Sequence, residues 1–197
     1  MFRTLLLSCI AVAAISVVAF AGLNTDAKVA VHVLPHASRT CSGLPTIAGC
    51  ADIIETETSH DVDAFPVFFD MVEYQGFDYG MSWPGLYSCV FTSCSYLTIG
   101  DIVWPGDGIA HAWATCQPGP VGIPGWAWIF DFGTVCVIPH PLFDRISAAD
   151  CQGGTTADSV LTSRSFCAGI GGSSGENPCG TMGIESSTWG DIKAVFK

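Results

Sequence analysis

Hydrophobic residues recur at every second position in several short stretches, and this period of two is typical of β-strands that bury one face. The first stretch is 28–34, where three valines alternate with small or polar residues. Residues 63–85 predict two strands around Gly76, and Pro66 favours an edge position or a strand start in the first of them. Further strands are expected within 86–92, 96–104, 108–116, 125–138 and 144–151, separated by turns rich in Gly, Pro and Asp.

This succession of short strands, without long helical periodicity between them, predicts an all-β fold. We expect an antiparallel β-sandwich of the Ig-like or jelly-roll type, stapled by disulfides, over residues 22–167. Residues 168–186 are rich in Gly and Ser and predict a flexible linker. Residues 187–197 predict a short helical or extended tail that acts as a docking or sorting segment.

The N-terminal residues 1–21 predict a cleaved signal peptide. Arg3 precedes an apolar stretch, and Ala19-Phe20-Ala21 has the small-x-small pattern of a signal peptidase site. An uncleaved anchor and a lipoprotein signal at Cys9 are the alternatives. We therefore expect a secreted or cell-surface protein with no membrane span in the mature chain.

Charge narrows the class of partner. The 197 residues include 18 acidic and 7 basic residues, for a net charge of −11. Removal of residues 1–21 deletes only Arg3 among the charged residues, so the mature charge is 6 − 18 = −12. A chain this acidic, without a basic cluster, lacks the counter-charge for phosphate backbones, which excludes nucleic acid. A polysaccharide or another surface protein is the expected partner.

Cysteines fit export to an oxidising compartment. Nine remain after residue 21, and four disulfides with one leftover thiol are the simplest arrangement. Their spacing lacks the short pairs of zinc sites, so no metal or other cofactor is predicted. Local pairing predicts Cys41–Cys50, Cys116–Cys136, Cys151–Cys167 and Cys89–Cys94, with Cys179 unpaired.

Residues 125–133 carry the most distinctive pattern. Strand alternation places four aromatic side chains on one face: Trp126, Trp128, Phe130 and Phe132. Four aligned aromatic rings are most simply one sheet's contribution to the core. The alternative is a platform that stacks on sugar rings, with Trp83 or Trp104, each followed by Pro-Gly, adding further stacking surface.

Catalytic and metal-binding patterns are weak. The motif G-x-S-x-G at 171–175 lies inside the Gly/Ser-rich segment, where a nucleophile elbow has neither its strand nor its helix. The five histidines show no paired ligand spacing. Asp61, Asp63 and Asp70 are weak candidate oxygen ligands for calcium, without an EF-hand pattern.

Most of the mature chain resembles a group of exported, cysteine-rich bacterial proteins. The resemblance rests on 61–85, 88–116, the Trp-rich strand and the terminal TWG-x-IK segment at 188–193. That group supplies no activity and no functional residues. A fainter analogy, on 76–83, is to cohesin-type and carbohydrate-module sandwiches.

The sequence thus predicts an exported, non-enzymatic binding or structural protein of the cell surface or extracellular space. A carbohydrate-binding module with an aromatic face is the first alternative, and a secreted hydrolase with an unrecognised site is the second.

Overall fold

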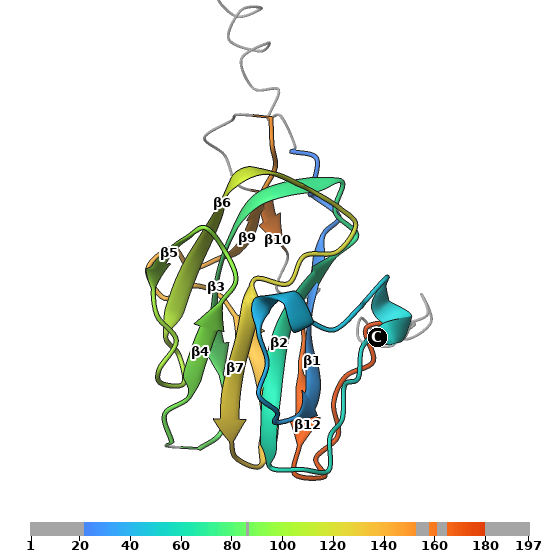
Figure 1. The fold of residues 1–197 in the computed structure, drawn as a ribbon, viewed down its shortest axis with the longest axis vertical. Helices are drawn as coiled ribbons and strands as arrows, with labels where there is room; N and C mark the ends of the chain where they lie inside the picture. The colour runs from blue at the N-terminus through green and yellow to red at the C-terminus, as the bar shows by residue number, and fades with distance from the viewer. Residues whose placement is uncertain (1–21, 86, 153–157, 161–164, 180–197) are drawn as a thin grey trace, which may run out of the picture.

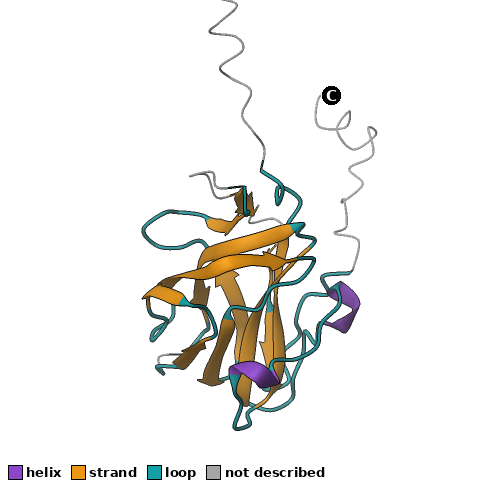
Figure 2. Ribbon diagram, turned by 45° about the horizontal axis from the view of Figure 1, so that its top comes forward, coloured by secondary structure: helices purple, strands orange, loops and turns teal. Residues whose placement is uncertain are grey.

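The computed structural model describes residues 22–85, 87–152, 158–160 and 165–179. Over these residues the chain forms two packed β-sheets and two short 3-10 turns, η1 (Cys41–Gly43) and η2 (Cys50–Asp52) (Figures 1 and 2). The described strands, in chain order, are β1 (Lys28–Pro35), β2 (Asp61–Phe69), β3 (Glu73–Ser82), β4 (Val90–Ser93), β5 (Leu97–Gly100), β6 (Gly108–Pro118), β7 (Gly125–Phe130), β8 (Gly133–Ile138), β9 (Ile146–Ala149), β10 (Asp158–Val160), β11 (Ser165–Phe166) and β12 (Ala168–Ile170). The all-β sandwich expected from the period of two is confirmed.

The two sheets are mostly antiparallel. The five-stranded sheet has the order β11-β1-β2-β7-β4, and β1 and β11 run parallel to one another. The seven-stranded sheet has the order β10-β9-β3-β6-β5, with β8 pairing both β3 and β12. Strands β8 and β9 lie one after the other along the same side of β3. Strand β8 pairs with Gly80–Ser82, and β9 pairs with Gly76–Asp78. Strands β4 and β5 therefore form the edges of the two sheets on one side of the sandwich.

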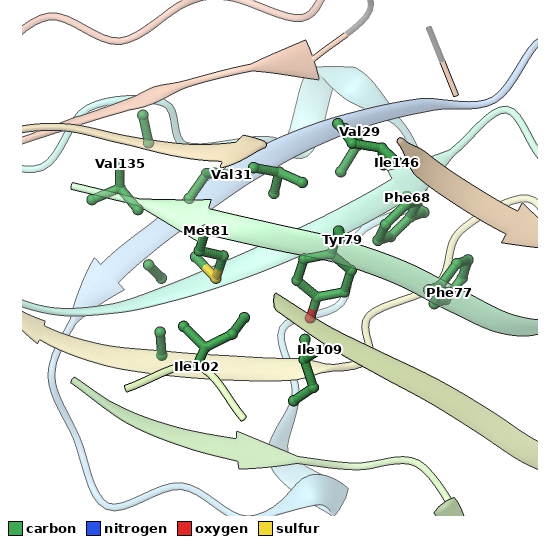
Figure 3. Packing of buried hydrophobic residues seen from close by; sticks show 14 of the residues in the cluster. Val29, Val31, Phe68, Phe77, Tyr79, Met81, Ile102, Ile109, Val135 and Ile146 are labelled. Carbon is green, nitrogen blue, oxygen red and sulfur yellow. The ribbon is translucent and has the colours of Figure 1, made fainter. Parts of the chain in front are cut away.

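The main core fills the space between the sheets (Figure 3). Val29 and Val31 of β1 and Phe77, Tyr79 and Met81 of β3 all point into it, as their alternation predicts. Rings of the two sheets meet there: Phe68 of β2 stacks on Phe77 with their centroids 4.1 Å apart. This burial of apolar surface is the main force that holds the two sheets together.

A second, smaller core lies on the opposite face of the five-stranded sheet. The segment 36–58, which contains η1 and η2, crosses this face and covers part of it. Ile47 and Ile53 from that segment pack with Phe65 of β2 and Trp126 of β7. The five-stranded sheet is therefore buried on both faces over part of its area, and open to solvent elsewhere.

The predicted boundary between the two strands of 63–85 is wrong. The chain turns at Asp70, which has φ of +60°, and Gly76 lies inside β3 at a register shift between Tyr74 and Gly76. A Cβ at Gly76 would lie 2.8 Å from the His111 carbonyl oxygen, so the glycine permits a close approach of β6 rather than a turn.

Pro66 lies in a central strand, but beyond Ala64, the last β2 residue that pairs with β7. Its missing amide therefore costs no ladder hydrogen bond on that side.

The prediction of a flexible linker at 168–186 is wrong over its first part. Ala168–Ile170 forms β12, pairs with β8 and is buried in the main core. Gly169 and Gly175 do not mark a linker, because each lies at a close approach of backbone. A Cβ on Gly169 would lie 1.9 Å from the Ser173 carbonyl oxygen, and a Cβ on Gly175 would lie 1.7 Å from the Glu55 carbonyl oxygen. The rest of that segment after Cys179, and the tail 187–197, lie outside the described residues.

The number of disulfides is as predicted, but each predicted pairing is wrong. Among the residues that the structure describes, the bonds are Cys41–Cys94, Cys50–Cys179, Cys116–Cys151 and Cys136–Cys167, and Cys89 is the one free cysteine. Pairing of cysteines close in sequence is wrong because the bonded cysteines lie on strands and loops that the fold brings together from distant parts of the chain. Cys136 of β8 meets Cys167, for example, where the chain passes from β11 to β12. These four bonds are consistent with an oxidising, extracellular environment.

Candidate functional site

The open part of the five-stranded sheet carries exposed aromatic side chains. Trp128 and Phe130 of β7 point to the outer face of the sheet, on the same side as Trp126, which lies under the segment 36–58. Phe132 follows in the turn after β7, and Tyr87 precedes β4. All four are more than one-third exposed, and we call Tyr87, Trp128, Phe130 and Phe132 the aromatic face.

A groove of about 320 Å³ runs along this face. It is lined by Tyr87, Ser88, Val90, Trp128 and Phe130, none of which is charged. The register explains the grouping, because Val90 of β4 pairs directly with Trp128 of β7 and both side chains leave the sheet on one side. An apolar hollow with a few hydroxyl groups at its rim is the usual composition of a small-molecule or glycan site.

The indole of Trp128 is held in place by two contacts. Its Nε1 donates a hydrogen bond of 2.7 Å to Asp61 Oδ1, and its ring stacks on His36 with centroids 4.4 Å apart and planes 13° apart. His36 follows β1, on the far side of β2, whereas Val90 lies on the other side of β7. The indole is thus supported from one side and faces the groove on the other.

A buried carboxylate anchors this support. Asp63 is fully buried and accepts hydrogen bonds from His36 Nδ1 at 2.7 Å, Arg39 Nε at 2.6 Å and the Ala37 amide at 3.2 Å. Arg39 also lies over the Phe65 ring, 5.6 Å from its centroid. Since a buried charge is stable only when paired, this cluster fixes the chain after β1 and with it the position of His36.

The other end of the aromatic face is ordered by His60. Its ring meets Phe130 edge-on at 4.5 Å and stacks on Phe132 at 5.0 Å. Phe132 in turn lies against Gly171, where a Cβ would come within 2.3 Å of the phenyl ring and φ is +62°. A glycine is therefore needed at 171 both for its conformation and for the space that Phe132 occupies.

The four predicted tryptophans fall into two groups. Trp126 and Trp83 are buried, in the second and the main core respectively, so neither presents a ring face to solvent. Trp128 and Trp104 are exposed, but Trp104 lies in the β5–β6 loop and does not line the groove. Of the aligned aromatics at 126–132, only Trp126 is a core residue, because the segment 36–58 buries it, whereas His36 of that segment covers one side of Trp128 and leaves the ring 41% exposed. Tyr87 and Val90 of the groove were missed, since no periodic pattern points to them.

The calcium candidates do not form a cluster. The Asp61 and Asp63 carboxylates bind protein donors as described, and Asp70 pairs with Lys28 Nζ at 2.6 Å. Within the described ranges, one trio of metal-ligating side chains has its ligand atoms close together: Glu73, Cys116 and Cys151. The two sulfurs of that trio are joined in a disulfide, which leaves one carboxylate.

His32 and His111 are buried and have lowered pKa values. Burial lowers the pKa of His111 to about 4, and burial, together with the charge of Arg39, lowers the pKa of His32 to about 4. His111 Nε2 lies 3.1 Å from the Tyr79 hydroxyl, and its Nδ1 lies 3.2 Å and 3.0 Å from the hydroxyls of Ser93 and Ser95. Both ring nitrogens are occupied by hydroxyl groups, so the cluster links β3 and β6 to the β4–β5 turn.

A second hollow lies on the outer face of the seven-stranded sheet. Its floor consists of small residues such as Gly76, Ala110 and Ala149, and Asp78 lies at one side. The Asp78 carboxylate accepts a hydrogen bond from the Ser147 hydroxyl and lies 3.6 Å from Arg145 Nη2. This hollow lacks the exposed rings of the aromatic face.

Comparisons with known proteins do not assign this chain: no protein-family model, curated protein or solved structure matches it. Among the residues that the structure describes, there is no helix of the length and apolarity that a membrane span requires.

Proposed function

We propose that the protein is an exported, non-enzymatic binding protein whose aromatic face stacks on the sugar rings of an uncharged extracellular polysaccharide. One observation carries the proposal: Tyr87, Trp128 and Phe130 line a single uncharged groove and remain 67%, 41% and 52% exposed. Exposed aromatic side chains that converge on one hollow are uncommon on a surface without a binding partner.

Ring stacking suits this arrangement. The C–H groups on one side of a pyranose ring are apolar and pack against the face of an indole or phenyl ring, while the hydroxyl groups need polar partners at the rim. The Tyr87 and Ser88 hydroxyls supply such partners. Trp128 and Phe130 are two residues apart on a strand, so their Cα atoms lie roughly 7 Å apart, which suits successive units of a polymer.

Charge favours a neutral ligand. The chain has a net charge of −11, and no Lys or Arg lines the groove. An anionic polysaccharide would therefore meet long-range repulsion and find no cation at the site. The preorganised Trp128 also favours binding, because the Asp61 hydrogen bond and the His36 stack already restrict its side chain before the ligand arrives.

The test is retention of the purified protein on insoluble neutral polysaccharides, namely cellulose, xylan, chitin and mixed-linkage glucan. We expect retention on at least one of them, and Trp128→Ala and Tyr87→Ala should each lower the affinity at least tenfold, about 1.4 kcal/mol. Trp104→Ala is the matched control, because Trp104 is also an exposed tryptophan but lies outside the groove.

Tyr87→Ala guards against a folding artefact, since the Tyr87 side chain is the most exposed of the groove aromatics. Near-ultraviolet circular dichroism shows whether each variant keeps the native packing. Failure of the wild type to bind any of the four polymers would refute the proposed ligand class. Equal binding by Trp128→Ala and the wild type would refute the proposed site.

A further inference from the structure

We propose that β5 is a self-association edge, at which two copies of the chain pair their β5 strands antiparallel and join their seven-stranded sheets into one. The inference is independent of the polysaccharide site, because it rests on another part of the molecule. Among the described strands, β5 is the last of its sheet and pairs with β6 alone.

The outer side of β5 is open for pairing. Among the described residues, no backbone group outside β6 hydrogen-bonds to the backbone of Leu97–Gly100, and the side chain that does so is Ser95, whose hydroxyl donates to the Leu97 carbonyl. An exposed strand edge of this kind is a template for another strand. Natural edges are commonly protected by lysine, proline or an inward-pointing charge, and β5 contains none of these.

The side chains at this edge are apolar. Leu97 and Ile99 point to the outer face of the sheet and are 51% and 66% exposed, and the neighbouring Tyr96 is also exposed. The residues beside them on β6, Ala110 and Ala112, are small, so Leu97 and Ile99 stand above their neighbours. A partner strand would therefore find apolar side chains to pack against as well as backbone groups to bond.

The distribution of charge points to a second copy as the partner. The chain carries a net charge of −11, yet the two strands at this edge, β5 and β6, contain no Asp, Glu, Lys or Arg, and the nearest acidic residue along the chain is Asp101, just after β5. Two identical acidic molecules approach with least repulsion where both surfaces are uncharged. A basic partner would instead be drawn to the acidic surfaces elsewhere on the chain.

Two-fold symmetry gives a specific register. If Thr98 lies on the axis, Leu97 of each copy is directly opposite Ile99 of the other, and both side chains are on the outer face. Each molecule then contributes the same residues to the interface, and the pairing closes as a dimer without further growth along this edge.

The test measures the mass of the purified protein by sedimentation equilibrium up to about 1 mM, the range in which small interfaces associate. We expect a concentration-dependent dimer for the wild type. Ile99→Lys and Leu97→Glu should each abolish it, because each places charges at the paired edge. The double variant Leu97→Glu/Ile99→Lys should restore dimers, since the two-fold register sets a carboxylate opposite an ammonium group. Val72→Lys is the matched control: Val72 is equally exposed but lies in the β2–β3 turn.

Hydrogen exchange gives a readout at the strand itself. Amide exchange over 97–100 should slow as the protein concentration rises, whereas exchange over 70–72 should not change. A wild type that stays monomeric over the whole concentration range would overturn the inference, and β5 would then be an edge at which a strand of another protein could pair. Dimers that survive Ile99→Lys, or that Val72→Lys also abolishes, would place the interface elsewhere.

Discussion

Substitution of Asp63 by asparagine tests how much the negative charge of this buried side chain contributes to stability, because the side-chain shape is nearly unchanged. The Asp63 side chain is fully buried, whereas the side chain of its partner Arg39 is 20% exposed. An asparagine occupies nearly the same volume and keeps one oxygen acceptor, but it removes the negative charge that compensates the Arg39 guanidinium. It also presents an amide N–H₂ group where the carboxylate accepts a hydrogen bond.

Loss of one partner of a buried ion pair costs about 3–5 kcal/mol. Because Arg39 retains some contact with water, we expect the low end, about 3 kcal/mol of the free energy of unfolding. For a domain of this size that loss lowers Tm by roughly 6–12 °C. The His36 ring would also lose the carboxylate that holds it against Trp128.

Asp70→Asn is the matched control. Asp70 also forms a 2.6 Å ion pair, with Lys28, but both side chains are exposed, so its loss should cost less than about 1 kcal/mol. Asparagine also tolerates the φ of +60° at that position. Urea unfolding of both variants and the wild type, followed by tryptophan fluorescence, gives the comparison. A difference between the two variants smaller than about 1 kcal/mol would contradict the role given to Asp63.

Two further predictions concern buried titratable groups. The pKa of His111 is lowered from 6.5 to about 4 by burial, so the unfolded chain takes up a proton below pH 6.5 while the folded chain does not until about pH 4. The free energy of unfolding should therefore decrease as the pH falls from 6.5 to about 4, by at most about 1.4 kcal/mol per pH unit for each such histidine. In urea titrations at several pH values, His111→Gln should make the free energy of unfolding depend less on pH. Burial raises the pKa of Cys89 to about 12, with a smaller contribution from the charge of Asp101, so the thiol should resist iodoacetamide in the native protein. In a chain that begins at residue 22, unfolding without reductant should let one equivalent of label react, whereas rapid labelling of the native protein would show that Cys89 is accessible.

The fold class was readable from the chain because strand periodicity is a local property. In each alternating stretch, the positions of the apolar residues show which face of the strand is buried. Phe77, Tyr79 and Met81 of β3 point into the core as their spacing predicts. An odd number of cysteines after residue 21 likewise implied one unpaired thiol, whatever the fold. The strand boundary near Gly76 and the linker at 168–186 failed because glycine has two uses. It ends strands, but it also permits close backbone approach inside a sheet.

The candidate site depended on contacts between distant segments. Alternation correctly placed Trp126, Trp128 and Phe130 on one face of a strand, and that much follows from the sequence alone. Whether a ring on that face is core or surface depends on what covers it. The segment 36–58 buries Trp126, but it meets Trp128 only through His36, so that ring stays 41% exposed. The same reason explains the cysteines: their number is a property of the composition, but their pairing follows from which strands become neighbours. Local periodicity thus determines the strands and their faces, whereas long-range packing alone decides which faces are buried and which side chains meet.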